Sequence, residues 1–237
     1  MTVRRLFRDR ALLIGTIIIS LLVLVAVFAG PLSTYPDHVT GFDPNHRLSP
    51  PGWQFLLGTD RMGADIYSRL LFGARLTILI AVTATGAAVI IGVPIGLVAG
   101  YFDGWASEGL MRISDIFLAV PQIVLAIAIA QTLGPNIQNV ILALSVTYWP
   151  FWARLVYAET RSQRNEVYVE AAKAMGASPW RIMVLHILPN ISGSIIVRTT
   201  IGMGATILAA ASLGFLGLGA PPPAPEWGRM IAESREF

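Results

Sequence analysis

Long stretches without a charged side chain constrain the fold of this 237-residue sequence more than any other feature. Three stretches hold 26 or 27 uncharged residues each, and a fourth, between Asp115 and Arg154, holds 38. A helix needs roughly 20 apolar residues to cross the core of a bilayer. Charged residues make up only 13% of the chain, about half of their usual share in soluble domains. The sequence therefore predicts an all-α integral membrane protein.

The ends of these uncharged stretches predict five membrane-spanning helices. The longest stretch is divided by the turn sequence Leu133-Gly134-Pro135-Asn136, which leaves room for one span on each side. Backbone polar groups inside lipid must be satisfied within each segment, so helix is the expected state. The predicted spans cover residues 11–31, 76–100, 115–133, 138–157 and 194–217.

The first apolar run has a second interpretation as a cleavable signal peptide. It follows four arginines and contains Val27-Phe28-Ala29, which resembles a cleavage site. An apolar run near 20 residues is longer than the roughly 7–15 of a signal peptide. We therefore expect residues 11–31 to be retained as an anchor.

The basic residues favour a cytoplasmic N-terminus, because Lys and Arg are typically in excess in cytoplasmic loops. In that orientation eleven basic residues lie in or beside the inner segments, against six in the outer segments. The predicted organisation is a cytoplasmic N-terminus (1–10), an anchor (11–31), an outer loop (32–75), a core (76–217) that contains the cytoplasmic loop 158–193, and a second outer loop (218–237).

The residue patterns of catalytic and metal sites are missing from the sequence. No titratable side chain lies deep inside a predicted span, and no span offers a nucleophile with a base. His38, His46 and His186 are scattered in loops, cysteine is absent, and there is no phosphate-binding G-x-x-x-x-G-K-[ST] sequence. The net charge of +3 is too small to suggest a nucleic-acid partner. We expect no catalytic site, metal or cofactor.

Glycines and prolines inside the spans indicate how the helices pack. Gly92, Gly96 and Gly100 form two overlapping G-x-x-x-G steps, which let a neighbouring helix approach closely. Kinks are expected at the prolines of three spans, Pro94, Pro121 and Pro150.

The cytoplasmic loop 158–193 is polar and favours helix, unlike the segments around it. Val167 to Met175 predict one short helix, which Gly176 ends. Ser178-Pro179 suits the cap and first position of a second helix, expected over about 179–188 and ending before Pro189. A small-residue surface that suits a partner's cleft is expected from Ala171, Ala172 and Ala174.

Six residues of this loop resemble the EAA loop of permeases from ATP-binding-cassette (ABC) importers: Glu170, Ala171, Ala172, Gly176, Leu188 and Pro189. The spacing of 13 residues from Gly176 to Pro189 agrees with that pattern. His186 stands where the family usually has Ile, a replacement that the peptide-permease branch often shows.

A second segment resembles the same branch of permeases. Leu57 to Arg69 reads LGTDRMGADIYSR, similar to the LGTDxxGRDxxSR segment of that branch, with Ala64 in place of its Arg. Shorter matches lie at residues 73–75, 211–219 and 225–228. The resemblance covers nearly the whole chain and points to the C-type permease of dipeptide, oligopeptide or nickel importers.

This resemblance implies a complex and a mechanism. Two homologous permeases would assemble with two ATPases and an outer substrate-binding protein in the lipid of a bacterial or archaeal cytoplasmic membrane. ATP would close the ATPases, move the loop helices together and rock the multi-pass spans between outward and inward access. Such permeases usually have six spans and cytoplasmic ends, so a chain that ends at Phe237 is expected to be truncated before the last span.

The resemblance also implies roles for three groups of residues. In the ATPase-coupling loop, Glu170 would anchor the helix, Ala171 and Ala172 would allow close docking, Gly176 would make the turn, and Leu188-Pro189 would set the entry into the last predicted span. The residues expected to face the pathway are Thr199, Thr200, Met203 and Thr206. Those expected to help dock the binding protein are Asp60, Arg61, Asp65 and Arg69.

Two other classes of protein compete with this interpretation. A stand-alone channel or secondary carrier would need no ATPase, but it would leave the polar loop 158–193 without a purpose. A truncated, non-transporting membrane protein that only binds partners is the second alternative. The expected solute is a di- or oligopeptide, with nickel and glutathione-like compounds as alternatives.

Overall fold

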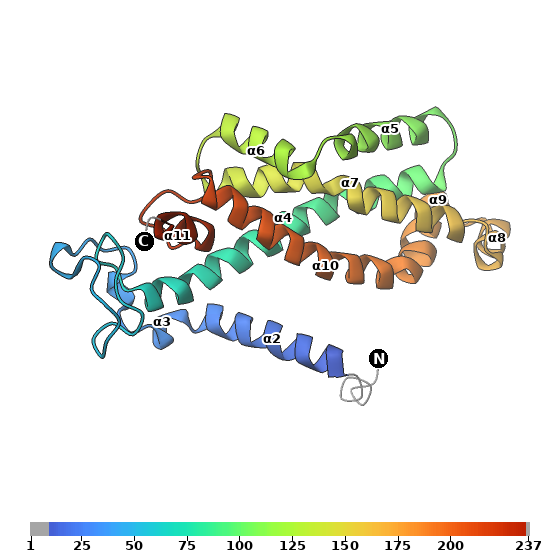
Figure 1. The fold of residues 1–237 in the computed structure, drawn as a ribbon. Coiled ribbons are helices and arrows are strands. Elements are labelled where there is room, and N and C mark those ends of the chain that lie inside the picture. The colour runs from blue at the N-terminus through green and yellow to red at the C-terminus, as the bar shows by residue number, and fades with distance from the viewer. Residues whose placement is uncertain (1–9, 236–237) are drawn as a thin grey trace. The chain divides into compact units, whose positions relative to one another are not determined.

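The computed structural model describes residues 10–235, so nearly all of the predicted cytoplasmic segment 1–10 lies outside the described part of the chain. Helices dominate these residues, which contain no strand and only one isolated bridge, between Thr59 and Asp65 (Figure 1). The chain divides into two compact units. One combines the residues up to Leu79 with those from Gly214 onward, and the other is Ile80–Leu213.

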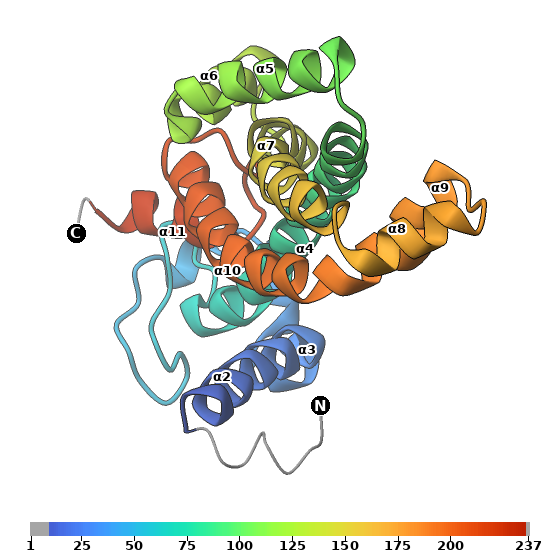
Figure 2. The same ribbon diagram turned by 90° about the vertical axis from the view of Figure 1, so that its right-hand side faces the viewer.

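The unit Ile80–Leu213 is built from consecutive helices. Within it, α5 and α6 both pack against α7, and Figures 1 and 2 show the pair along one side of that helix. The helices are α4 (Ile66–Tyr101, which begins in the other unit), α5 (Trp105–Ala119), α6 (Gln122–Leu133), α7 (Ile137–Gln163), α8 (Val167–Ala174), α9 (Pro179–Ile182), a π-helical turn (Met183–Ile187) and α10 (Leu188–Phe215, which ends in the other unit).

Three helical segments of the described chain are long and apolar enough to cross a membrane: Ile66–Tyr101, Ile137–Gln163 and Pro179–Phe215. Each contains all or most of a predicted span but is longer than predicted. The bent pair α5 and α6 makes a fourth if it is counted as one span, while Leu13–Val27 is a shorter apolar helix. The all-α membrane fold is therefore confirmed, although the described helices do not give five full-length spans.

The span predicted over residues 115–133 is divided at Pro121, where a kink was expected, and the bend there is sharp because α5 and α6 meet at an angle of 88°. Val120 is extended (φ −92°, ψ 133°) and Pro121 follows it at the N-cap of α6. A residue before proline is pushed out of the helical region by contact with the proline ring. Pro94 and Pro150, in contrast, lie inside α4 and α7.

The glycine steps of α4 lie against α7, as predicted. A Cβ atom at Gly92 would lie 2.5 Å from the carbonyl oxygen of Trp149, and one at Gly96 would lie 2.5 Å from that of Ala153. At Gly100 the corresponding distance to the carbonyl oxygen of Tyr157 is 2.7 Å. The two helices therefore touch through their backbones, which only glycine allows at these positions.

Pro189 does not end the second loop helix, contrary to the prediction. The helical segment runs without interruption from Pro179 to Phe215 and passes through the π-helical turn Met183–Ile187 just before Pro189. Proline lacks a backbone N–H and crowds the carbonyl four residues earlier. A π-helical turn changes the hydrogen-bond spacing at that place, so the helix continues past the proline.

The other unit contains α2 (Arg10–Val27), α3 (Ala29–Leu32), two single 3₁₀ turns (Pro36–His38 and Pro44–His46), the start of α4 and α11 (Trp227–Ser234). Arg75 donates hydrogen bonds to the carbonyl oxygens of Ala26 at 3.1 Å and Val27 at 3.2 Å. The indole N–H of Trp227 donates to the carbonyl of Leu70 at 3.0 Å. These contacts join the two ends of the sequence to the start of α4.

Candidate functional site

The predicted coupling loop forms a helix, a glycine turn and a second helix. Helix α8 ends as a Schellman motif, in which Ala177 N–H donates to the Ala172 carbonyl and Gly176 N–H to the Lys173 carbonyl. Gly176 has φ +79°, the left-handed conformation that this motif requires. Ser178 then caps α9 by accepting a hydrogen bond from the N–H of Arg181 at 3.4 Å. The local predictions for this turn are therefore confirmed.

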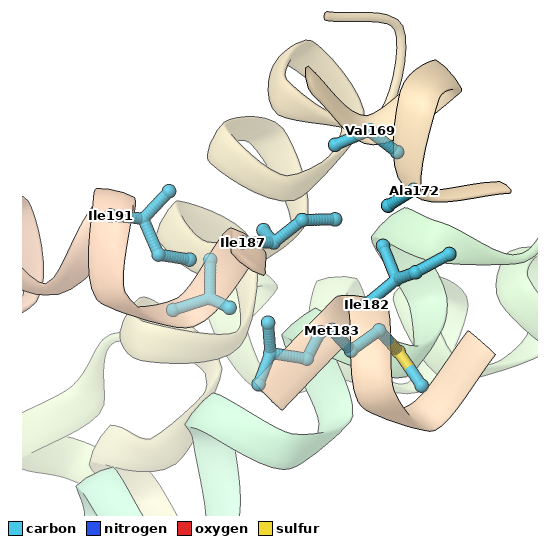
Figure 3. Packing of buried hydrophobic residues seen from close by; sticks show 8 residues of the cluster. Val169, Ala172, Ile182, Met183, Ile187 and Ile191 are labelled. Atoms are coloured by element: carbon cyan, nitrogen blue, oxygen red, sulfur yellow. The ribbon is translucent and has the colours of Figure 1, made fainter. Parts of the chain in front are cut away.

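The inner side of α8 is buried in a hydrophobic cluster. Val169 and Ala172 pack with Ile182, Met183 and Ile187, and the cluster reaches Ile191 at the start of α10 (Figure 3). It also includes Leu97 of α4 and Val156 of α7. Because the cluster joins α8 to three long helices, α8 cannot shift without pressing on them.

The outer side of α8 is exposed. Val167 at the start of α8 is 79% exposed and Met175 at its C-cap is 80% exposed, and beyond the glycine turn Trp180 of α9 is 64% exposed. Glu170 is exposed, and its carboxylate forms no hydrogen bond or ion pair with any described residue of the chain. We call this set the α8 surface: Val167, Glu170, Ala171, Ala174, Met175 and Trp180. Ala172, predicted to belong to such a surface, instead faces the buried cluster.

A polar tether fixes the base of the loop to the end of α4. Arg164, at the C-terminus of α7, donates to the carboxylate of Asp103 at 2.7 Å and to the carbonyl of Tyr101 at 3.1 Å. The hydrogen bond from Arg164 holds the pKa of Asp103 below its ordinary value. Lys173 of α8 lies 5.7 Å from the centre of the Tyr101 ring. The sequence did not reveal this tether, because its members are about 60 residues apart.

The four predicted pathway residues of α10 have different surroundings. Thr206 is buried and accepts a hydrogen bond from Thr85 of α4 at 3.1 Å, so it faces its own chain. Thr199 accepts from the indole N–H of Trp152 at 3.1 Å. Thr200 is exposed and Met203 is half-buried. The structure therefore does not bring these four side chains together on one open face.

The predicted outer docking residues form part of the unit that contains α11. Arg69 is only 3% exposed, and its guanidinium pairs with Asp60 and lies 3.9 Å from Glu233. Asp60 also accepts from two backbone N–H groups, and Asp65 is buried and accepts from the backbone N–H and the hydroxyl of Ser68. Asp60, Arg61 and Arg69 line a cavity of about 410 Å³. Asp65 and Arg69 are thus packed inside this unit rather than standing out from it.

Glu226 is a buried acid that sequence reasoning did not single out. It is 3% exposed and accepts a hydrogen bond from the N–H of Ala220 at 2.6 Å. Its Oε1 atom has no hydrogen-bond partner among the described residues. Burial raises the pKa of Glu226, although the Ala220 N–H and the charge of Arg229 act in the opposite direction.

The helical fold and the loop define a membrane permease. Residues 92–235 match the family described as binding-protein-dependent transport system inner membrane component, and residues 1–51 match the N-terminal transmembrane domain of oligopeptide transport permease C. The chain belongs to this family of ABC-importer permeases. The resemblance to ABC-importer permeases that the sequence showed is therefore confirmed.

Particular relatives refine this assignment. The chain is 44% identical to the dipeptide transport system permease protein DppC of Alkalihalophilus pseudofirmus, over 99% of this chain and 76% of that protein. It is 39% identical to the glutathione transport system permease protein GsiD of Pectobacterium atrosepticum, over 98% and 77%. The inward-facing MetNI methionine ABC transporter has the same fold, with a TM-score of 0.56 and 24% identity over 64% of this chain and 76% of that one.

Proposed function

We propose that this chain is one of the two permease subunits of a peptide importer and that its α8 surface receives an ABC ATPase. Membership of the family implies ATPase and substrate-binding partners in general terms. We propose in addition that the complete complex contains two ATPases, a homologous second permease and an outer binding protein that delivers the solute. The proposed orientation in the membrane places the N-terminus and α8 in the cytoplasm, as the distribution of Lys and Arg favours.

One observation carries the proposal, namely the two-sided construction of α8. Its inner residues Val169 and Ala172 are locked into a cluster with the spanning helices, while Val167, Met175 and Trp180 are exposed. Exposed apolar groups rimmed by polar residues are typical of protein interaction sites. A push on this surface would therefore be transmitted through Ile187 and Ile191 to α10.

Glu170 indicates what the partner surface should offer. Its carboxylate has no partner in the described chain, and a carboxylate in an interface must be satisfied by a cation or by N–H groups. The ATPase surface that fits is an apolar cleft with a basic side chain or free backbone N–H groups at one edge. A channel or secondary carrier would gain nothing from such a helix, so the importer remains the preferred function.

A peptide is the proposed solute because of the names of the relatives. Those at 39–44% identity over nearly the whole chain are named for dipeptide or glutathione transport, and glutathione is itself a short peptide. This supports a short peptide with a free carboxylate as the substrate class.

Co-purification tests the coupling role of α8. The tagged chain is expressed with its second permease and ATPases, and the ATPase recovered per permease is measured for the parent, Glu170→Arg and Gly176→Asp. Both variants should lose most of the ATPase. Glu108→Arg, at an exposed position of α5, is the matched control and should retain it. Equal recovery with Glu170→Arg and the parent would refute the assignment of the α8 surface.

A further inference from the structure

A cavity between α6, α7 and α10 is not explained by the coupling role. It has a volume of about 150 Å³ and belongs entirely to the unit Ile80–Leu213. Arg198 of α10 lines it, together with Gln122 at the start of α6 and Tyr148 of α7. Arg198 falls within the predicted span 194–217, and the structure places it in the wall of this cavity.

An arginine in a spanning helix is costly unless it has a polar partner or lines a cavity that holds one. Arg198 lies in the long apolar segment Pro179–Phe215. None of the ion pairs among residues 10–235 involves Arg198, and its guanidinium carbon is 5.0 Å from the centre of the Phe151 ring. The Phe151 ring gives the Arg198 guanidinium a cation–π contact, but no anionic group of the described chain balances its charge.

The other polar groups of the cavity are also donors. The amide nitrogen of Gln122 is buried and has no hydrogen-bond partner among the described residues. Gln122 is the first residue of α6, where backbone N–H groups are free and the helix end carries partial positive charge. Tyr148 adds a hydroxyl group. No acidic residue lines this cavity, and Arg198, the Gln122 amide nitrogen and the Tyr148 hydroxyl can all donate, so the cavity suits a group that accepts several hydrogen bonds.

From this arrangement we infer that the cavity binds the carboxylate of the transported solute, so that Arg198 is a solute-binding residue of the pathway. A carboxylate accepts a pair of hydrogen bonds from one guanidinium and has lone pairs left for further donors such as Gln122. Phe151, Trp152 and Ile201 provide an apolar wall for the adjoining residue. A cavity near 150 Å³ holds about as much as one benzene molecule, which suits the C-terminal end of a short peptide rather than a whole one.

This inference rests on the proposed peptide solute and deepens it. The test uses the complete permease–ATPase complex in nanodiscs without the binding protein, which would impose its own selectivity. Equilibrium binding of radiolabelled Ala-Ala and of its C-terminal amide is measured. The parent should bind Ala-Ala at least tenfold more tightly than the amide. Arg198→Gln should remove that preference while leaving binding of the amide unchanged.

Controls separate binding from folding and from lipid. Arg112→Gln, an exposed arginine of α5, should keep the preference, and Arg198→Lys should keep part of it. Recovery of ATPase with Arg198→Gln should equal that of the parent, which shows an intact complex. Equal binding of dipeptide and amide by the parent, or no dipeptide binding up to 10 mM, would overturn the inference. So would an Arg198-dependent retention of anionic phosphatidylglycerol that Ala-Ala does not displace.

Transport in proteoliposomes distinguishes this inference from the proposed function. If the full transporter with its binding protein takes up Ala-Ala and Arg198→Gln binds it like the parent, the pathway site is wrong and the peptide importer stands. If the full transporter takes up no peptide, the proposed solute class is wrong.

Discussion

Arg164 donates a hydrogen bond to Asp103 across 2.7 Å, and this contact joins the end of α7 to the residues that follow α4. A second bond from Arg164 reaches the carbonyl of Tyr101 at the last position of α4. The base of the coupling loop is thus held to the helix whose glycine face packs against α7. In the proposed function, motion of α8 would reach the spans by two routes, this tether and the hydrophobic cluster.

Loss of the tether should weaken coupling more than assembly. Asp103→Asn removes the charge that Arg164 holds, and we expect peptide uptake per ATP hydrolysed to fall about two- to fivefold, because an exposed ion pair contributes only modestly. The ratio is measured in proteoliposomes. Asp115→Asn breaks a comparable pair with Arg154, between α5 and α7, and should leave the ratio unchanged. An unchanged ratio in Asp103→Asn would contradict a coupling role for this pair.

The backbone contact between α4 and α7 should be intolerant of a single methyl group. In Gly96→Ala the new Cβ would lie 2.5 Å from the Ala153 carbonyl, so the helices must separate, at a cost of about 1–3 kcal/mol. The melting temperature of the purified complex should fall. At Gly86 of the same helix no described atom lies within 4 Å of an added Cβ, so Gly86→Ala should leave the melting temperature unchanged or raise it. Equal responses would contradict the close packing.

The buried acid Glu226 should make the stability of its unit depend on pH. Because burial raises its pKa, the folded chain holds the proton more tightly than the unfolded chain does. Stability is therefore fully present below the ordinary value of 4.5 and declines as pH rises from there through the raised pKa. Thermal unfolding between pH 4 and 8 should show that decline, and Glu226→Gln should flatten it.

A comparison variant makes that experiment specific. Glu108 is exposed on α5, so Glu108→Gln should preserve the decline of the parent. A slope that persists unchanged in Glu226→Gln would assign the pH dependence to another group.

The proposed orientation is open to direct measurement, because the chain contains no cysteine. Trp53 is fully exposed in the predicted outer loop, and Met175 is 80% exposed on the α8 surface. A membrane-impermeant maleimide added to intact cells should label Trp53→Cys and spare Met175→Cys until the cells are permeabilised. The reverse pattern would place the N-terminus and α8 outside.

Local signals in the sequence predicted local structure well. The end of α8, the left-handed Gly176 and the Ser178 cap each follow from one or two residues whose backbone preference is strong. The helix breaks were harder to predict. Pro121 separates two helices whereas Pro189 follows a π-helical turn and interrupts nothing, and that difference depends on packing that the local sequence does not contain.

Long-range partners account for most of what the sequence did not show. The pairing of Arg164 with Asp103 and that of Arg69 with Glu233 join residues far apart in the chain. Arg198 lies near the start of the predicted span 194–217, and the pattern of charges alone does not show which side chains line a cavity. The exposed position expected for Ala172 was wrong for a related reason, since a run of alanines does not reveal which of them faces the core.

The π-helical turn Met183–Ile187 sets the rotational phase between the coupling loop and the last long helix. Such a turn holds roughly one residue more than an α-helical turn, and each α-helical residue rotates the side-chain direction by about 100°. The extra residue in this turn therefore rotates the direction of Trp180 relative to that of Arg198 by about 100°, compared with a regular α-helix. Deleting one residue from the π-helical turn would keep the sequences of α9 and α10 but change the rotation of one helix relative to the other. A force on Trp180 would then turn α10 toward a different neighbouring helix.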